Sequence, residues 1–478
     1  MLKTKIICTL GPATDDENVL RELIQKGMNV ARLNFSHGSY EEQQIRIDTF
    51  KKLRSESGLP IALMLDTKGP EIRIKKFKDG QADLVEGQKF TLTTRDSVGD
   101  NSGVSINYHD LPHDLQIGNS ILIDDGLIKI SVESIDKENI VCNVVNGGTI
   151  CNNKSINIPD IQINLPYMSE QDKSDILFGI QNDVDFISAS FVRNKQDVME
   201  IRDLLSENNG KHINVIAKIE NQDGVDNIDE IISVSDGIMV ARGDMGVEIP
   251  FENIPSIQKM LVKKCYTAGK RVIVATQMLD SMIRNPRPTR AETTDVANAI
   301  DEGTSAIMLS GETAAGKYPV ESLETMVKIA AKAESEINYR KRFEETHFPM
   351  RNTTDAISHA TCTTANDLNA TAIITVTKSG HTARMVSKFR PDCPIIAATI
   401  TESVWRQLAL SWGVYPVMAD IKTSTDELFD HVVERALASG LVKNGDLVVI
   451  TGGVPLGISG TTNILKVQIV DIPQKAAN

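Results

Sequence analysis

Two short apolar segments of the sequence each end in charged side chains of the types that bind metal ions and phosphate. Residues 215–219 lead into Glu220, with Lys218 two positions before it, and residues 237–241 are followed closely by Asp244. Because side chains alternate along a strand, Lys218 and Glu220 would point the same way. Two carboxylates beside a lysine suit a hard divalent cation next to a phosphoryl group. For one isolated turn, ordinary solvated loop charges are the alternative interpretation.

The elements that must position these residues repeat along the chain. Eight short apolar segments, each followed by a segment of helical character, are expected as strands: residues 5–9, 28–33, 61–65, 185–189, 215–219, 237–241, 271–275 and 305–309. Eight such units indicate an α/β fold with a closed (β/α)₈ TIM barrel rather than an open doubly wound sheet. The C-terminal ends of all barrel strands share one face, so polar side chains should gather there: Arg32, Asn34, Ser36, Asp66, Lys218, Glu220, Asp244, Thr276 and Glu312. Unrelated loop charges do not explain a polar cluster after nearly every strand.

The strand–helix rhythm is interrupted once and ends well before the C-terminus. Between the third and fourth strands, short alternating segments separated by Gly, Asp and Asn turns predict a small inserted β-barrel domain. It would close over the barrel mouth as a lid and exclude water, on hinges near Pro70 and Pro166. We predict barrel segments at 1–69 and 168–338, the lid at 70–167, and a C-terminal α/β regulatory domain at 339–478.

Composition limits the class of protein. The 478 residues are too many for a single core, and 41% hydrophobic with 24% charged residues is typical of a globular protein. A formal net charge of −13 argues against nucleic acid or an anionic membrane as the main partner. The six cysteines lack metal-binding spacing and are expected as mostly buried thiols. With no signal peptide expected and no apolar segment of about 20 residues, a cytoplasmic enzyme is predicted.

The sequence resembles the pyruvate kinase family over essentially its whole length. The matching motifs occur in the family's order: NFSHG at 34–38, LDTKGPEIR at 65–73, KIEN at 218–221, MVARGD at 239–244, ATQML at 275–279, PRPTRAE at 286–292 and LSGET at 309–313. The resemblance implies that the protein transfers phosphate from phosphoenolpyruvate to ADP, giving pyruvate and ATP. It also implies assembly as a homotetramer.

The resemblance further implies roles for individual residues. The Mg²⁺ (or Mn²⁺) ligands would be Glu220 and Asp244, and the K⁺ ligands would be Asn34, Ser36, Asp66 and Thr67. The catalytic residues would be Lys218, which stabilises the transition state and the enolate, Arg32 and Thr276. Phosphoenolpyruvate would contact Arg32, Lys218, Gly243, Asp244 and Thr276. The nucleotide would contact Asn34, His37, Arg73 and Lys154.

Two positions qualify this assignment. Glu71 stands where an acidic residue accompanies K⁺ dependence in the family, so we predict activation by K⁺. Relatives usually carry glycine where Ser155 and Asp160 stand, which leaves the nucleotide contact of Lys154 open. Whether Thr276 or a water molecule supplies the proton also stays open.

A second phosphate site is expected in the C-terminal domain. The turn from Thr377 to Thr382 presents hydroxyls, a lysine and backbone amides at the start of a helix. The resemblance implies that a phosphorylated activator binds there, through Thr377, Lys378, Ser379, Gly380 and Thr382, with the loop 452–460 folding over it. The alternative is a capped helix start without a ligand.

Two other functions compete with a kinase. A Mg²⁺-dependent phosphoenolpyruvate mutase or lyase would also place carboxylates at strand ends, but it needs no lid, nucleotide contacts or K⁺ site; dependence on ADP separates the two. A catalytically silent sensor of phosphorylated ligands would be expected to have lost Lys218, Glu220 or Thr276, and all three are present.

Overall fold

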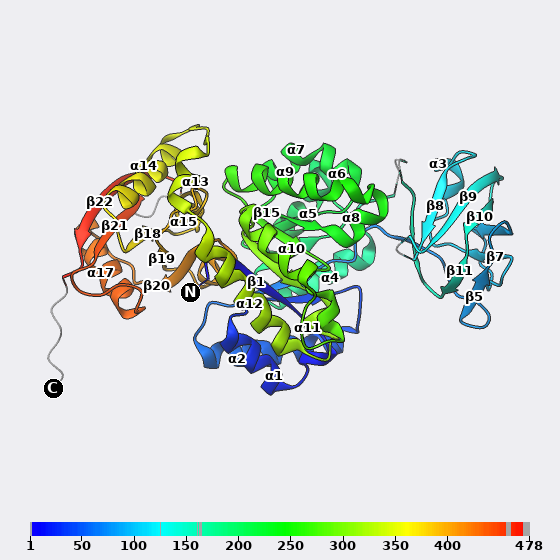
Figure 1. The fold of residues 1–478 in the computed structure, drawn as a ribbon, viewed down its shortest axis with the longest axis horizontal. Helices are drawn as coiled ribbons and strands as arrows, with labels where there is room; N and C mark the ends of the chain where they lie inside the picture. Colours follow the sequence, from blue (N-terminus) through cyan, green and yellow to red (C-terminus); the bar gives the residue numbers. More distant parts are fainter. Residues whose placement is uncertain (1, 125, 160, 162–164, 456–459, 472–478) are drawn as a thin grey trace.

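Three bodies lie in a row in the computed structural model, which describes residues 2–124, 126–159, 161, 165–455 and 460–471. A barrel stands in the middle, with an all-β body at one end and an α/β body at the other (Figure 1). The all-β body and the α/β body lie on opposite sides of the barrel, which separates them (Figure 1).

The central body is a closed barrel of parallel strands in the order β1-β17-β16-β15-β14-β13-β3-β2. The predicted (β/α)₈ fold is therefore confirmed, with strand ends shifted by at most two residues. The strands are β1 (Lys5–Leu10), β2 (Val30–Asn34), β3 (Ala62–Asp66), β13 (Phe186–Ala189), β14 (Asn214–Ile219), β15 (Gly237–Ala241), β16 (Arg271–Ala275) and β17 (Ala306–Leu309).

Helices cover the outside of this barrel (Figure 1). Side-chain caps fix where several of them begin: Ser39 and Ser169 each complete a capping box, and Asp16 accepts a hydrogen bond from the first turn of α1. The α-helices are α1 (Glu17–Lys26), α2 (Tyr40–Ser57), α4 (Glu170–Gln181), α5 (Lys195–Glu207), α6 (Gln222–Asp226), α7 (Ile228–Val234), α8 (Arg242–Glu248), α9 (Ile254–Thr267), α10 (Arg290–Asp301), α11 (Gly311–Ala314) and α12 (Pro319–Glu336). Short 3₁₀ turns are η1 (Pro12–Thr14), η2 (Phe251–Asn253) and η3 (Asp280–Ile283).

The barrel interior is a packed core. Inward side chains such as Met64, Phe186 and Met239 are fully buried there, and Leu410 from the C-terminal body joins the same cluster. A residue of the C-terminal body therefore seals one end of the barrel. The opposite end carries the polar strand termini described below.

The inserted body is a small curled sheet with the strand order β4-β12-β8-β9-β10-β6-β7. Its two outer strands are joined by an isolated bridge between Ile74 and Ile106 and by a 2.7 Å hydrogen bond from Lys75 N–H to Ser105 O, so it closes as predicted. A two-stranded sheet, β11-β5, completes the body. The elements are β4 (Ile72–Arg73), β5 (Gln81–Leu84), β6 (Lys89–Thr93), β7 (Gly103–Ser105), α3 (Leu111–Asp114), β8 (Ser120–Ile123), β9 (Ile128–Ile135), β10 (Asn139–Asn146), β11 (Gly148–Cys151) and β12 (Ser155–Asn157).

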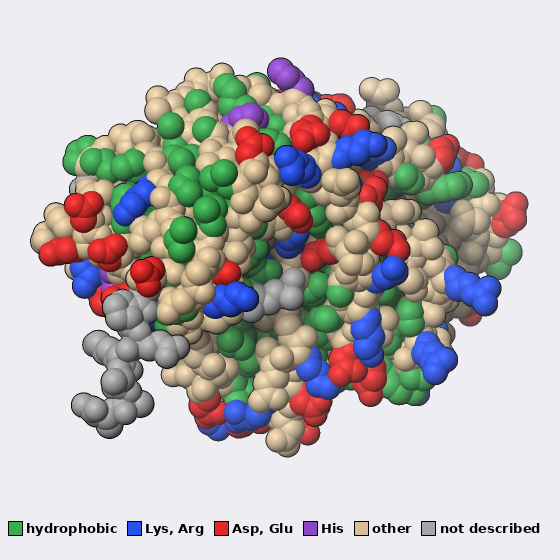
Figure 2. Space-filling view, turned by 60° about the vertical axis from the view of Figure 1, so that its left-hand side comes forward, with side chains coloured by type: hydrophobic (Ala, Val, Ile, Leu, Met, Phe, Trp, Pro, Cys, Tyr) green, Lys and Arg blue, Asp and Glu red, His purple; other side chains and the backbone are tan. Residues whose placement is uncertain are grey.

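The C-terminal body contains a five-stranded sheet in the order β20-β19-β18-β21-β22, with β22 antiparallel to β21. Hydrophobic side chains gather on the left of Figure 2, where this body is turned forward. The sequence analysis did not predict β20. The elements are α13 (Tyr339–Glu345), α14 (Thr353–Asp367), β18 (Ala372–Val376), α15 (His381–Ser387), β19 (Ile395–Thr399), α16 (Glu402–Leu408), β20 (Val414–Met418), α17 (Thr425–Ala438), β21 (Leu447–Gly453) and β22 (Thr462–Ile469).

The first residues of the chain bind the C-terminal body. Lys3 O accepts a 2.8 Å hydrogen bond from Gly413 N–H, and the buried ammonium of Lys5 donates to Val414 O at 2.8 Å. The hydroxyl of Tyr415 donates to Leu2 O at 2.9 Å. The N-terminal residues are thus held to the C-terminal body beside the closed end of the barrel.

Candidate active site

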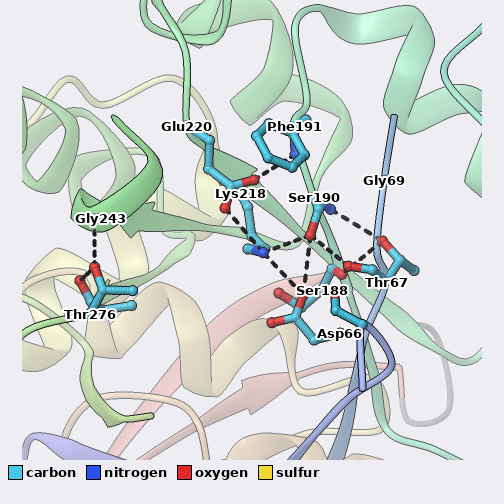
Figure 3. Close-up of polar contacts among 12 residues, drawn as sticks. Asp66, Thr67, Gly69, Ser188, Ser190, Phe191, Lys218, Glu220, Gly243 and Thr276 are labelled. Carbon is cyan, nitrogen blue, oxygen red and sulfur yellow. Dashed lines mark hydrogen bonds and ion pairs between the residues drawn. The ribbon is translucent and has the colours of Figure 1, made fainter. Parts of the chain in front are cut away.

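The ammonium of Lys218 is the centre of the polar cluster at the barrel mouth (Figure 3). It lies 3.2 Å from Asp66 Oδ1 and 3.1 Å from Glu220 Oε1, and it donates a 2.6 Å hydrogen bond to Ser190 Oγ. Burial lowers the pKa of Lys218, but the two carboxylates outweigh burial and the pKa lies above its usual range. The lysine therefore carries a fixed positive charge in a site with little water.

Arg32 supplies a second buried cation from the end of β2. Its Nε donates to Asp66 Oδ2 at 2.5 Å, and one of its Nη atoms donates to Thr9 Oγ1 at 3.0 Å. Burial raises the pKa of Asp66, but Arg32 and Lys218 outweigh it and keep this pKa below the usual range. Arg32 and Lys218 thus share the carboxylate of Asp66, and Lys218 also faces Glu220.

Ser190, which the sequence analysis did not select, connects these groups. Its hydroxyl is 3.3 Å from Asp66 Oδ1 and donates to Thr67 O at 2.6 Å, while Ser190 N–H donates to Thr67 Oγ1 at 3.2 Å. Ser190 directly follows β13, and the sequence analysis assigned no site residue to the end of that strand. Its position directly after a barrel strand was the available signal.

Glu220 lies next to a second carboxylate, that of Asp244. Its Oε2 accepts a 2.6 Å hydrogen bond from Phe191 N–H, whose backbone has a φ of 54°. Its Oε1 is buried without a hydrogen bond among the described residues, although the Lys218 ammonium is near. Burial raises the pKa of Glu220, Lys218 opposes that rise, and Asp244 adds to it.

These two carboxylates fit a divalent cation. A buried oxygen that lacks a hydrogen bond and a neighbouring acid that repels it are both satisfied when a cation lies between them. Nowhere in the described ranges do three or more His, Cys, Asp or Glu side chains come together in a metal-binding arrangement. The remaining ligands would then be water and substrate oxygens, which is how Mg²⁺ is commonly bound at phosphate sites.

Thr276 and Gly243 form a separate pair at the mouth (Figure 3). Thr276 Oγ1 accepts a 2.8 Å hydrogen bond from Gly243 N–H and donates to Ala275 O at 2.6 Å. Thr276 and Gln277 have φ values of 66° and 53°, which are unusual for residues with side chains. Gly243, Asp244 and Thr276 all line one open hollow of about 1090 Å³.

A cavity of about 310 Å³ lies between the barrel mouth and the inserted body. Asp244 lines it from the barrel, and Arg73 and Lys154 line it from the inserted body. Arg73 is paired with Glu71 at 2.6 Å, and Lys154 with Asp124 at 2.7 Å. Arg73 and Lys154, two of the predicted nucleotide contacts, therefore line the same cavity as Asp244, a predicted metal ligand. Each of these two cations is already paired with a carboxylate.

The β2–α2 turn holds the other predicted ligands. The side chain of His37 is exposed and also lines the 310 Å³ cavity. Asn34 Oδ1 accepts a 3.1 Å hydrogen bond from Ser36 N–H. Asn34, at the end of β2, pairs in register with Asp66, at the end of β3. One carboxylate with amide and hydroxyl oxygens is a donor set that suits a monovalent cation.

The predicted effector turn borders a cavity of about 290 Å³ in the C-terminal body. Its lining includes Thr377, Lys378, Ser379 and Thr382, while Gly380 is the N-cap of α15 with a φ of 75° and no side-chain cap. Thr382 Oγ1 instead shares a 2.8 Å hydrogen bond with Thr462 Oγ1. Residues 456–459 of the predicted covering loop, and Asp160 in the inserted body, lie outside the described residues.

Comparison with known proteins identifies the family. A family model described as the barrel domain of pyruvate kinase matches residues 1–323, and one described as its alpha/beta domain matches residues 355–468. The chain belongs to the pyruvate kinase family. This confirms the resemblance seen in the sequence.

Individual relatives agree along the whole chain. The chain is 54% identical to a pyruvate kinase from Clostridium acetobutylicum, covering 98% of this chain and 100% of that protein. It is 52% identical to one from Geobacillus stearothermophilus, covering 98% of this chain and 80% of that protein. A crystal structure of a pyruvate kinase from Cryptosporidium parvum superposes with a TM-score of 0.93 at 40% identity, covering 98% and 96% of the two chains.

Membership of the pyruvate kinase family makes the protein a phosphotransferase of glycolysis. The family generally depends on Mg²⁺ and K⁺. None of the helices in the described part of the chain has the length and apolar character that a membrane crossing requires.

Proposed function

We propose that the barrel mouth transfers the phosphoryl group of phosphoenolpyruvate to ADP, giving pyruvate and ATP. The observation that carries this proposal is the buried ammonium of Lys218, held at about 3 Å from both Asp66 and Glu220 and hydrogen-bonded to Ser190. A cation fixed in this way stabilises negative charge that develops on the enolate oxygen and on the transferring phosphoryl group.

The residues around Lys218 divide the remaining work. Arg32, with its Nε held by Asp66, binds the phosphate of phosphoenolpyruvate through its free face. Gly243 and Asp244, in the first turn of α8, contact the other end of the substrate. Thr276 directs a proton to the carbon that becomes the methyl group of pyruvate, either itself or through water.

Glu220 and Asp244 would hold Mg²⁺, which supplies positive charge to the phosphoryl oxygens when it is bound. Their adjacent carboxyls, and the buried Oε1 of Glu220 that lacks a hydrogen bond in the described ranges, support this assignment. Mn²⁺ would take the same oxygen ligands.

Asn34, Ser36, Asp66 and Thr67 would hold K⁺. The register that places Asn34 beside Asp66 supports this assignment. Glu71, paired with Arg73, would leave the K⁺ requirement in place because it brings no positive charge to the site.

The nucleotide would bind in the 310 Å³ cavity that His37, Arg73 and Lys154 line, and Asn34, which does not line that cavity, would be a further contact. Its phosphates would take over the cationic partners of Glu71 and Asp124, because Arg73 can bind phosphate oxygens in a bidentate pair and Lys154 can bind them as a point charge. The inserted body, with boundaries near 70 and 167, would then close as a lid and exclude water as a competing acceptor.

The C-terminal body, from about residue 339, would bind a phosphorylated activator in its 290 Å³ cavity. The lysine and hydroxyl side chains that line this cavity, those of Thr377, Lys378, Ser379 and Thr382, support a ligand over a simple capped helix start. A homotetramer in the cytoplasm is the expected form. The exposed Val467 and Ile469 on the outer strand β22 support assembly through this body.

The test is ATP formation from phosphoenolpyruvate, ADP and Mg²⁺, with K⁺ or with tetramethylammonium as a cation that cannot be bound in its place. We expect turnover that requires ADP and is strongly activated by K⁺. A Glu71→Lys variant should lose most of the K⁺ activation, with Glu86→Lys, an exposed change in the same body, as the control. Consumption of phosphoenolpyruvate without ADP would instead identify a mutase or lyase.

A further inference from the structure

Six cationic side chains line two adjoining cavities at the junction of the barrel and the C-terminal body. The outer cavity is about 260 Å³ and the inner one about 10 Å³; they share Gly269, Lys270, Arg384 and Lys388. Arg351 adds a cation to the outer cavity, and Arg271 and Arg390 add two to the inner one. Nothing in the proposed phosphotransfer uses these residues, and they lie at the closed end of the barrel.

The carboxylates at this junction do not balance these cations. Of the described residues that line the two cavities, only Asp236 and Asp355 are acidic. Asp355 accepts a 2.8 Å hydrogen bond from Lys388, and Asp236 accepts one of 2.8 Å from Arg202, which lines neither cavity. Positive charge is therefore in excess here, in a chain whose formal net charge is −13.

Arg271, at the start of β16, is only 2% exposed and has one unused nitrogen. Its Nε donates to Ser411 Oγ at 3.2 Å and one Nη donates to Gln407 O at 3.1 Å. The other Nη has no hydrogen bond among the described residues. A buried guanidinium rarely leaves such a donor unused.

Arg390 repeats this pattern from the C-terminal body. It is 5% exposed, and its two Nη atoms donate to Ser387 O and Gly303 O, each at 3.0 Å. Its Nε has no hydrogen bond in the ranges that the structure describes. Two buried arginines from different bodies therefore line the same inner cavity, and each has one nitrogen without a hydrogen bond among the described residues. The guanidinium group of Arg271 also lies over the ring of Phe186, and that of Arg390 over the ring of Trp412.

Like charges also oppose each other at this junction. Burial and, after it, the nearby Arg384 together lower the pKa of Arg271 to about 9. Burial lowers the pKa of Lys270 as well, and although Asp236 opposes this, Arg384 adds to it. An anion bound nearby would offset this repulsion.

We propose that the 260 Å³ outer cavity of this junction binds a phosphate-type dianion, either inorganic phosphate or the phosphate of a small phosphomonoester, between Lys270 of the barrel and Arg351, Arg384 and Lys388 of the C-terminal body. Arg271 and Arg390 add positive charge from the adjoining inner cavity, which is too small to hold a phosphate itself. Guanidinium groups match the geometry of phosphate oxygens in bidentate pairs. The outer cavity has room for a small organic group beside the phosphate.

This site is separate from the 290 Å³ cavity of the predicted activator. The activator cavity shares one lining residue, His381, with the outer cavity of the junction. None of the six cations at the junction lines the activator cavity. The activator cavity has Lys378 and Lys422 as its basic residues among those described. Lys270→Gln can therefore test the junction without changing the activator turn, whereas Arg384 also donates a 3.1 Å hydrogen bond to Ser379 O in that turn.

The test is calorimetric titration of the full-length protein with inorganic phosphate and, separately, with glycerol 1-phosphate, at constant ionic strength. Lys270→Gln is the main variant because it lies on the barrel side, away from the activator turn. Arg384→Gln is the second variant, and Lys378→Gln removes a charge from the activator cavity. Arg340→Gln removes an arginine charge from an exposed helix of the same body and is the matched control.

We expect saturable binding in the unmodified protein, in Arg340→Gln and in Lys378→Gln. Lys270→Gln and Arg384→Gln should each weaken binding about tenfold or more, since each removes a charged hydrogen-bond donor. Thermal unfolding midpoints close to that of the unmodified protein would show that these variants are folded. Tighter binding of glycerol 1-phosphate would identify a phosphomonoester as the ligand, and binding of inorganic phosphate alone would identify the free ion.

Three results would overturn the proposal. They are no saturable binding of either probe, full binding by both Lys270→Gln and Arg384→Gln, or loss of all binding in Lys378→Gln. The last result would place the phosphate in the activator cavity.

Discussion

At the scale of single residues, the buried network around Lys218 affects both the proposed catalysis and the stability of the fold. The ammonium is 8% exposed and faces two nearly inaccessible carboxylates. Removing one partner of a buried ion pair commonly destabilises a protein by about 3–5 kcal/mol, because the other charge stays buried without compensation. Loss of activity and loss of stability must therefore be measured separately in any variant of this lysine.

A Lys218→Met variant should reduce ATP formation by about 10²–10³-fold, the effect typical of losing one charge-stabilising donor at an active site. Initial rates with saturating substrates measure this loss. Lys137→Met, which removes an exposed lysine of the inserted body, is the control. The role assigned to Lys218 is wrong if the variant remains folded and keeps its rate.

Thr276 tests the contribution of a hydroxyl on a strained backbone. Thr276→Ser keeps the oxygen that accepts from Gly243 N–H, whereas Thr276→Val keeps the shape and loses it. We expect Thr276→Val to lower kcat by about 10²-fold, within the range for a lost proton-transfer group, with a smaller change in KM. Thr276→Ser should retain most of the activity; equal losses in both variants would point to backbone strain rather than to the hydroxyl.

At the scale of elements, the periodicity of the sequence predicted the eight barrel strands and the helical segments that follow them. Nearly every barrel strand is followed by polar residues, so most of the mouth could be predicted from the strand ends. The pattern failed at β20, because Pro416 and the partly exposed residues of Val414–Met418 do not look like a buried strand. It also failed at Phe191, whose contribution to Glu220 is a backbone N–H that every residue type except proline carries.

The contact between β12 and α8 gives the lid and the barrel a shared titratable group. Glu248 Oε1 accepts a 3.2 Å hydrogen bond from Asn157 Nδ2, and burial raises the pKa of Glu248 from 4.5 to about 7. Between these two pH values the folded state holds a proton that the unfolded state has released. The free energy of unfolding should therefore fall as pH rises from 4.5 to 7.

A Glu248→Gln variant stays uncharged and keeps an oxygen for Asn157. We expect its thermal unfolding midpoint to depend less on pH between 4.5 and 7 than that of the unmodified protein. Glu86→Gln, at an exposed position of the inserted body, should leave the pH dependence unchanged. Parallel pH profiles for all three proteins would contradict this account.

At the scale of the whole molecule, Arg406 connects the C-terminal body to the closed end of the barrel. Its Nε donates to Asp185 Oδ1 and one Nη donates to Asp183 Oδ2, each at 2.7 Å. Asp185 is completely buried, and Arg54 is its other cationic neighbour at 3.7 Å. The junction thus depends on a charge pair that water does not screen.

An Arg406→Met variant should destabilise the protein by about 3 kcal/mol, at the lower end of the range for a broken buried pair because Arg54 remains. Thermal unfolding measures the loss as a drop in the midpoint. Adding Asp185→Asn should recover part of it, because the uncompensated charge is then gone. If the double variant is less stable than Arg406→Met, the charge of Asp185 is not the cause.

Because the N-terminal residues contact the C-terminal body, the parts of this protein can reach their final contacts only in a certain order. All strand pairs of the inserted body lie between Ile72 and Asn157, so it can form while most of the chain is still unmade. The barrel closes only when β17 is available to pair with β1, and Lys3 meets its partner only when Gly413 has left the ribosome. Lys3 is therefore made long before its partner Gly413 and reaches its final contact late, and a bulky tag fused directly ahead of Leu2 would compete with this step of folding.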